Sequence, residues 1–144
     1  AAAGARSSAP SHGSRVAQVY SAGGSRQEAE RGFPNVQKAL SVLRAGGDPV
    51  DALLVLLASV EDTNLLWRGG AEALGYVRAE AARILAAPRE QRISLVTALD
   101  DAFIKQHLSP GGSADLLSAA LFLYNAGISE SPSFLKSKPT EVFL

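Results

Sequence analysis

Residues 48–64 read DPVDALLVLLASVEDTN, and this stretch decides the fold. Asp48 followed by Pro49 is a typical helix start, because an Asp side chain accepts hydrogen bonds from the first turn and Pro is favoured at the first helical position. The segment from 49 to 60 is apolar nearly all round, which predicts a buried central helix. Its longest apolar run is well short of the ~20 residues that a membrane-spanning helix needs, so we expect no membrane span.

Apolar residues recur at three- and four-residue steps on both sides of this central segment. Short signals mark the expected helix ends: the cap Asn35, the pair Gly46 and Gly47, the pair Gly69 and Gly70, and the cap Ser113. The helix that follows Pro88 carries its expected apolar stripe on Ile93, Val96, Leu99, Phe103 and Ile104. No run alternates convincingly for a strand. We therefore predict an all-α fold, an orthogonal or irregular bundle of about five helices.

The composition limits the classes of function. The chain has 144 residues, of which 14 are Lys or Arg and 14 are Asp or Glu, with no Cys and no Met. A zero net charge argues against a general nucleic-acid binder, which would carry a basic excess. The absence of Cys excludes disulfides and thiolate metal sites, and it is compatible with the cytoplasmic location that we expect.

We divide the chain into three parts. Residues 1–25 form a flexible or truncated N-terminal segment, residues 26–127 a helical domain, and residues 128–144 an irregular C-terminal tail. One domain with a core fits this length. Because the chain begins at Ala1 and has no Met, we expect it to be processed or to be a piece of a longer polypeptide; a complete chain is the open alternative.

Three polar clusters lie at expected helix ends, and the first reads GGSRQEA at 23–29, followed by Gly32, Phe33 and Pro34. Glycines before a helix let backbone N–H groups approach an anion closely, and Arg26 in the first turn adds positive charge. A plain capped helix explains the same residues and is favoured when they are taken alone.

The second cluster reads EDTNLLWRGG at 61–70 and directly follows the most apolar helix. Glu61 and Asp62 oppose the macrodipole at that helix end, so a compensating positive charge is expected. A Mg²⁺ ion held by oxygen ligands is one compensator. An ion pair with Arg68 is equally compatible with the sequence.

The third cluster reads LSPGGSADLL at 108–117. A Gly-Gly-Ser turn before a helix offers free N–H donors, a hydroxyl and the positive end of the helix dipole. Asp115 in the first turn could hold a metal or a ribose hydroxyl, or simply complement the dipole. Phosphate binding and capping both stay open, and the motif is not a Walker loop because the Lys-Ser/Thr ending is absent.

Taken together and in this order, the three motifs resemble a known family. The strings GGSRQEAERGFP at 23–34, DTNLLWRGG at 62–70 and LSPGGSADLL at 108–117 are similar to the C-terminal half of triphosphoribosyl-dephospho-CoA synthases. The resemblance covers about residues 11–127. The amino-terminal signatures of the family, a Pro-Gly-Leu-Val-Asp segment and an Asn-Gly-Ala-His-x-Asp-Met type segment, are not in these 144 residues.

The resemblance implies part of a larger all-helical enzyme. Such an enzyme transfers the 5-triphosphoribosyl group of ATP to the 2′-hydroxyl of 3′-dephospho-CoA and releases adenine, for a prosthetic-group precursor of citrate lyase or malonate decarboxylase. It implies ATP as a substrate and Mg²⁺ as a cofactor, with neither nucleic acid nor membrane as a partner. Either the N-terminal half of the family or a second copy of this chain would complete the site.

The resemblance also implies roles for individual residues. The implied catalytic residues are Asp62, Asp115 and Glu28, with Asp62 and Asp115 also expected as Mg²⁺ or ribose ligands. The implied substrate- and phosphate-binding set is Arg26, Asn64, Arg68, Gly69, Gly70, Ser109, Gly111, Gly112 and Ser113.

Two other functions stay open on the sequence. One is a catalytically inert helical fragment or interaction module, in which the clusters serve only as caps and ion pairs. The other is a different nucleotide- or ADP-ribose-handling helical enzyme. An inert module would show no Mg²⁺-dependent stabilisation by nucleotides, whereas release of adenine in the presence of dephospho-CoA would separate the synthase from the other enzyme.

Overall fold

The structure is a computed structural model that describes residues 24–128, and in this range the chain forms six α-helices and no strand. The helices are α2 (Gly24–Glu30), α3 (Pro34–Arg44), α4 (Pro49–Ser59), α5 (Thr63–Ala86), α6 (Arg89–Gln106) and α7 (Gly111–Asn125). The all-α prediction is confirmed, with six helices where about five were expected. The segments predicted for residues 1–25 and 128–144 lie almost entirely outside the described residues.

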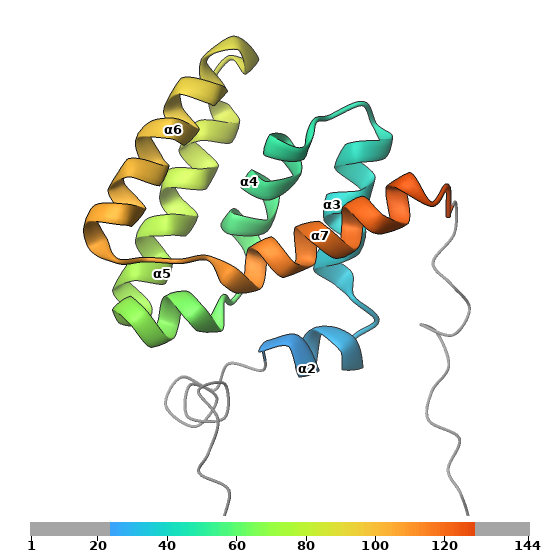
Figure 1. The fold of residues 1–144 in the computed structure, drawn as a ribbon, viewed down its shortest axis with the longest axis horizontal. Helices are drawn as coiled ribbons and strands as arrows, with labels where there is room; N and C mark the ends of the chain where they lie inside the picture. Colours follow the sequence, from blue (N-terminus) through green and yellow to red (C-terminus); the bar gives the residue numbers. More distant parts are fainter. Residues whose placement is uncertain (1–23, 129–144) are drawn as a thin grey trace, which may run out of the picture.

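The central helix is α4, as the sequence predicts. It packs against α3, α5 and α7, and Figure 1 shows it between these neighbours. Its start is fixed by a capping box, in which Asp48 Oδ1 accepts from the Asp51 amide at 2.9 Å and Asp51 Oδ2 accepts from the Asp48 amide at 3.4 Å. Pro49 occupies the first helical turn, where its missing N–H is not needed.

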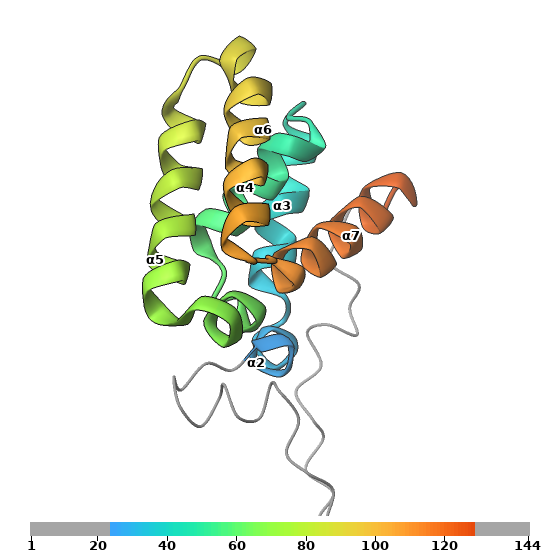
Figure 2. The same ribbon diagram turned by 60° about the vertical axis from the view of Figure 1, so that its left-hand side comes forward.

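Two apolar clusters form the core, one on each side of α4. On one side Leu54 and Leu57 pack with residues of α5 and α6, and Figure 2 shows these two helices side by side. On the other side Ala52 and Leu56 pack with residues of α3 and α7. The nearly uniform apolarity of α4 therefore follows from burial on opposite faces. Among the described residues, no helix is both long enough and apolar enough to cross a membrane.

Two predicted caps are wrong, and in both cases a hydrogen-bond partner in another element explains the error. The N-cap of α3 is Phe33, with Pro34 following, so Asn35 already lies inside the helix. Helix α7 begins at Gly111 after Pro110, which places Ser113 inside its first turn. The side chains of Asn35 and Ser113 instead bond to carboxylates from other elements, as described below.

The predicted break at Gly69 and Gly70 is confirmed as a kink that separates two helical stretches of α5. Gly70 has φ 69° and ψ −168°, a conformation outside the helical region and favoured by glycine, while residues on both sides are helical. The apolar stripe of α6 is confirmed at Leu99 and Phe103, which are buried, and at Val96, which is partly buried against the same cluster. Ile93 and Ile104 are 59% and 65% exposed, because α6 packs chiefly on α5 and only one of its faces is covered.

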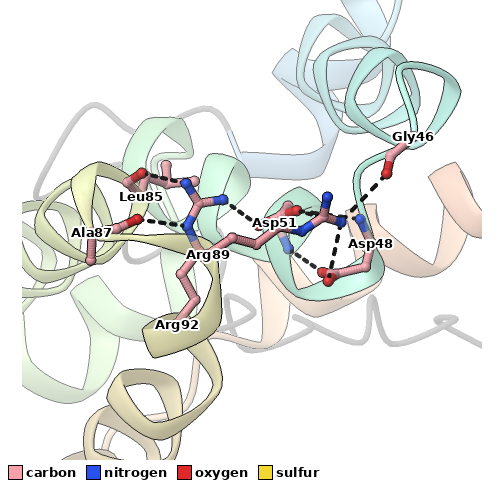
Figure 3. Close-up of polar contacts among 7 residues, drawn as sticks. All are labelled: Gly46, Asp48, Asp51, Leu85, Ala87, Arg89 and Arg92. Atoms are coloured by element: carbon pink, nitrogen blue, oxygen red, sulfur yellow. Dashed lines mark hydrogen bonds and ion pairs between the residues drawn. The ribbon is translucent and has the colours of Figure 1, made fainter.

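Two arginines of α6 reach the start of α4, and one of them, Arg92, also holds the end of α5; Figure 3 shows both side chains. Arg92 donates to Asp51 Oδ1 at 2.7 Å and to the carbonyls of Leu85 and Ala87 at 2.8 and 3.2 Å. Since these carbonyls belong to the last turn of α5 and its C-cap, Arg92 supplies donors that a helix C-terminus lacks. Arg89 adds ion pairs of 3.6 and 3.5 Å to Asp48 and Asp51.

The Asp51 carboxyl is buried, and burial alone would raise its pKa. Hydrogen bonds from Arg92 and the Asp48 backbone, with the attraction of Arg92 and Arg89, outweigh burial and lower the pKa below its ordinary value of 3.8. A carboxyl with a lowered folded-state pKa contributes stability above the unfolded-state pKa. This stability is lost as the pH falls through the folded-state value.

We expect Asp51→Asn to lower the free energy of unfolding at neutral pH by about 2 kcal/mol, since Arg92 loses a charged hydrogen-bond partner. The wild type should lose stability below about pH 5, and the variant should lose less over the same range. Urea denaturation between about pH 3 and pH 7 measures both effects. The matched control is Glu80→Gln, which removes a more exposed pair with Arg83 and should cost about 0.5 kcal/mol or less. Equal losses in the two variants would contradict the role given to Asp51.

Candidate active site

A polar pocket of about 730 Å³ lies where several helix ends meet. Its lining comes from α2, from the first turns of α3, α5 and α7, and from the end of α4 with the connection that follows it. Arg78 joins the lining from the long part of α5. Figures 1 and 2 show α2 beside the beginnings of α5 and α7. Five residues predicted from the sequence line this pocket: Glu28, Asp62, Asn64, Gly112 and Asp115.

Seven other predicted residues are not among those that line this pocket: Arg26, Arg68, Gly69, Gly70, Ser109, Gly111 and Ser113. Arg26 is exposed and pairs with Glu30 at 2.8 Å, and this hydrogen bond raises the pKa of its guanidinium. Arg68 reaches the carbonyl of His107 at 3.5 Å instead of pairing with Asp62. Gly69 lines a separate, smaller pocket of about 290 Å³.

Glu28 is buried and holds the start of α3. Its Oε1 accepts from the backbone amides of Asn35 and Val36 at 2.7 and 3.3 Å, and its Oε2 accepts from Asn35 Nδ2 at 2.8 Å. The first amides of a helix have no intrahelical acceptor, so a carboxylate from α2 supplies one. The Glu28 carboxylate therefore touches the pocket while it caps a neighbouring helix.

The Gly-Phe-Pro segment explains how Glu28 reaches this position. Gly32 and Phe33 both have positive φ, 76° and 56°, so the chain reverses tightly after α2. The Phe33 amide donates to the Glu28 carbonyl at 2.8 Å, and Pro34 then opens α3. Positive φ is uncommon for an aromatic residue, which shows how strongly the surroundings fix this turn.

Asp62 is the most completely engaged side chain of the site, at 1% exposure. Its Oδ1 accepts from the amides of Asn64 and Leu65 at 3.0 and 3.3 Å, which caps α5. Its Oδ2 accepts from the Ser113 amide at 2.8 Å and from the Ser113 hydroxyl at 2.9 Å. One carboxylate thus joins the N-termini of α5 and α7.

The glycines of the third cluster allow this contact. A Cβ on Gly112 would lie 3.2 Å from all three atoms of the Asp62 carboxylate group, and a Cβ on Gly111 would lie 2.7 Å from Asn64 Nδ2. The two glycines therefore let the start of α7 approach the start of α5 closely. Ser113 uses its amide and its hydroxyl on Asp62, so both groups are engaged within the protein.

Sequence reasoning missed three cations that line the pocket: Arg31, Lys38 and Arg78. Arg31 lies inside the first quoted motif but was given no role. Lys38 lies in α3, after the motif at 23–34, and Arg78 lies in α5, after the motif at 62–70. No local sequence pattern distinguishes these two cations from solvent-facing charges.

The remaining carboxylates of the lining are Glu61 and Asp115, and both are exposed. Neither side chain accepts a hydrogen bond or forms an ion pair within residues 24–128. Over the same range, no group of three or more His, Cys, Asp or Glu residues could hold a metal ion. The pocket thus offers two available carboxylates but no ready-made metal cage.

The fold and the pocket define an all-α protein with a polar pocket of mixed charge at converging helix N-termini. A family model described as ATP:dephospho-CoA triphosphoribosyl transferase matches residues 1–132. Since this match covers most of the chain, the chain belongs to that family. The resemblance found in the motifs is confirmed.

Curated relatives agree with this assignment. The chain is 38% identical over 129 residues to a probable 2-(5''-triphosphoribosyl)-3'-dephosphocoenzyme-A synthase of Pseudomonas putida, an alignment that covers 81% of this chain and 46% of the relative. It is 41% identical over 128 residues to a protein of the same description from Pectobacterium carotovorum, covering 83% and 42%. It is 43% identical over 111 residues to a synthase of Pectobacterium atrosepticum, covering 71% and 36%.

The chain therefore spans less than half the length of these relatives. No solved structure matches it significantly.

We expect Asp62→Asn to weaken the junction between α5 and α7. The Asn side chain keeps one oxygen for the α5 amides but turns a donor towards the Ser113 amide and hydroxyl. The buried donors then lack an acceptor, which should cost about 1–3 kcal/mol of unfolding free energy. Urea denaturation measures the loss, and hydrogen exchange should show faster exchange of the Ser113 amide.

Asp115→Asn is the matched control, because Asp115 is exposed and should change stability by less than about 0.5 kcal/mol. Gly112→Ala should also destabilise, since its Cβ would crowd the Asp62 carboxylate. Unchanged unfolding and unchanged Ser113 exchange in Asp62→Asn would show that the junction does not depend on this carboxylate.

Proposed function

We propose that this chain forms part of an enzyme that transfers the 5-triphosphoribosyl group of ATP to the 2′-hydroxyl of 3′-dephospho-CoA. The bond between the ribose anomeric carbon and adenine breaks, and a bond between that carbon and the acceptor oxygen forms. The acceptor hydroxyl gives up one proton to a base, and the adenine nitrogen that keeps the electron pair of the broken bond takes up one proton, so that neutral adenine departs. The family match motivates this reaction, and the polar pocket is the observation that carries it.

The reaction needs groups of both charges, and the pocket supplies them. A developing oxocarbenium ion is stabilised by carboxylates, a polyphosphate by cations, and the acceptor hydroxyl requires a base. Asp115 and Glu61 are exposed carboxylates on the lining, and Arg31, Lys38 and Arg78 are its cations. We assign the contact with the reacting atoms to Asp115, because its side chain is available and lies in the first turns of α7.

Glu28 and Asp62 receive a different part in this proposal. Both are buried, and their carboxylate oxygens already accept backbone amides of α3, α5 and α7. We assign them as positioning residues that act through the helix ends they hold. Asn64 and Gly112 would then face the substrate from the fixed ends of α5 and α7.

A Mg²⁺ ion belongs to the proposal as a companion of the ATP triphosphate. Asp115 and Glu61 have oxygens available for it, which fits the usual Mg²⁺ site of one or two carboxylates completed by phosphates and water. When bound, the ion would neutralise phosphate charge. Asp62 fits a direct ligand role less well, since both its oxygens are engaged by four donors.

Two further points follow from the same proposal. Because the relatives are more than twice as long as the matched region, we propose that residues beyond this chain, in the same polypeptide or in a second copy, contribute to the complete site. We also propose a cytoplasmic location, since ATP is the substrate.

The test is release of adenine from ATP by the complete gene product, with and without dephospho-CoA. We expect release that requires dephospho-CoA, and a loss of about 100-fold or more in Asp115→Asn, the range typical of an acid–base group. The matched control is Asp101→Asn, an exposed aspartate of α6 outside the pocket, which should keep the wild-type rate.

Each failure has a distinct meaning. Nucleotide-dependent stabilisation without adenine release would favour another nucleotide-handling enzyme, and no Mg²⁺-dependent stabilisation by ATP would favour an inert module. Dephospho-CoA-dependent release at an undiminished rate in Asp115→Asn would remove Asp115 from the mechanism and leave the reaction in place.

A further inference from the structure

Three cations line the pocket and form no ion pair with a carboxylate of residues 24–128. Arg31 directly follows α2, Lys38 lies in α3, and Arg78 lies in the long part of α5 after the kink. The ion pairs that the described part of the chain contains are made by other arginines: Arg26, Arg83, Arg89 and Arg92. Cations that share a pocket repel one another unless an anion lies between them.

The carboxylates of the same pocket do not provide that anion. Glu28 and Asp62 are held by helix amides, as described above. Glu61 and Asp115 form no ion pair with the described cations. The positive charge of this wall is therefore available to a ligand.

Arg78 is the most constrained of the three cations. Its Nη2 donates to the Ser59 carbonyl at 3.2 Å, at the C-terminal end of α4. Its Nε is buried and has no hydrogen-bond partner within residues 24–128. An unsatisfied buried donor is unfavourable, and in a native protein it calls for an explanation, of which a bound anion is one.

Lys38 is connected to the same place through two polar residues. Its Nζ donates to Asn35 Oδ1 at 3.3 Å, and the Ser59 hydroxyl lies 3.4 Å from that same oxygen. Arg78 donates to the carbonyl of Ser59. Two cations from α3 and α5 thus meet around Asn35 and Ser59, on the wall of the pocket.

We propose that Arg78, with Lys38 and Arg31, binds the polyphosphate chain of the substrate, and that Arg78 is its anchoring residue. The proposal rests on the function proposed above and replaces Arg26 and Arg68 as the expected phosphate ligands. A guanidinium held through one nitrogen can present its remaining donors as a fork that matches phosphate oxygens. The polyphosphate is either the triphosphate of ATP or the diphosphate of dephospho-CoA.

The test is calorimetric titration of the complete gene product with inorganic tripolyphosphate, ATP and dephospho-CoA in turn. Arg78→Gln removes the charge but keeps a donor for the Ser59 carbonyl, so the fold should survive. We expect it to weaken tripolyphosphate binding about 10- to 100-fold, the range of a charge-assisted hydrogen bond. Arg78→Lys should recover only part of the affinity, because an ammonium lacks the planar fork.

The matched control is Arg83→Gln on the same helix, whose guanidinium pairs with Glu80 at 2.7 Å and does not line the pocket. It should bind tripolyphosphate as the wild type does. A double variant, Arg31→Gln with Lys38→Gln, changes two exposed side chains and should weaken binding without affecting thermal stability.

If Arg78→Gln weakens the binding of ATP as it weakens that of tripolyphosphate, the bound phosphates are those of ATP. If it weakens the binding of dephospho-CoA instead, they are those of dephospho-CoA. Wild-type protein that does not bind tripolyphosphate, or Arg78→Gln that binds it unchanged, would overturn the proposal. Adenine release is measured on the same samples. If tripolyphosphate binding depends on Arg78 but no adenine is released, the proposed reaction alone is overturned. If adenine is released and Arg78→Gln binds tripolyphosphate unchanged, only the assignment of Arg78 to polyphosphate binding is overturned.

Discussion

The hydrogen bonds of the Asp62 carboxylate hold together the part of the structure on which the pocket depends. Every helix start exposes amides without intrahelical acceptors, and two such starts, those of α5 and α7, are brought together beside α4. Asp62 accepts hydrogen bonds from both helix starts: its Oδ1 accepts from the Asn64 amide of α5, and its Oδ2 accepts from the amide of Ser113, 51 residues away in the sequence. Glu28 does the same for α3 from α2. Two buried carboxylates thus set the positions of three helix ends.

This arrangement separates the charged groups of the pocket into two kinds. Glu28 and Asp62 are buried and accept hydrogen bonds from helix amides, at helix starts whose dipoles favour a negative group. Glu61 and Asp115, the other two carboxylates of the lining, form no ion pair within residues 24–128, so Arg31, Lys38 and Arg78 keep their charge available. The helix ends therefore determine which charges of the pocket are available to a ligand. This distribution cannot be read from the number of acidic residues or from the zero net charge of the chain.

Sequence reasoning succeeded where a single short stretch carries the whole cause. The burial of α4 follows from its uniform apolarity, and its start follows from the Asp48–Pro49 pair. It failed where the cause lies in another element. Ser113 reads as a cap because its acceptor, Asp62, is far away in the sequence, and Asn35 does so because Glu28 reaches it across the turn. Lys38 and Arg78 look like ordinary helix-surface charges until the fold places them around Ser59.

The motifs that identify the family are therefore to a large extent structural motifs. Gly112 lets α7 pack closely against Asp62, and Ser113 donates hydrogen bonds to the Asp62 carboxylate. The tight turn at Gly32, Phe33 and Pro34 brings Glu28 to the start of α3. A change at any of these positions moves a helix end and the pocket wall together, so loss of activity there cannot distinguish chemistry from folding. Exposed lining residues such as Asp115, Arg31 and Lys38 lack these structural bonds to carboxylates or helix ends. They are the positions at which the chemistry of the site can be separated from its architecture.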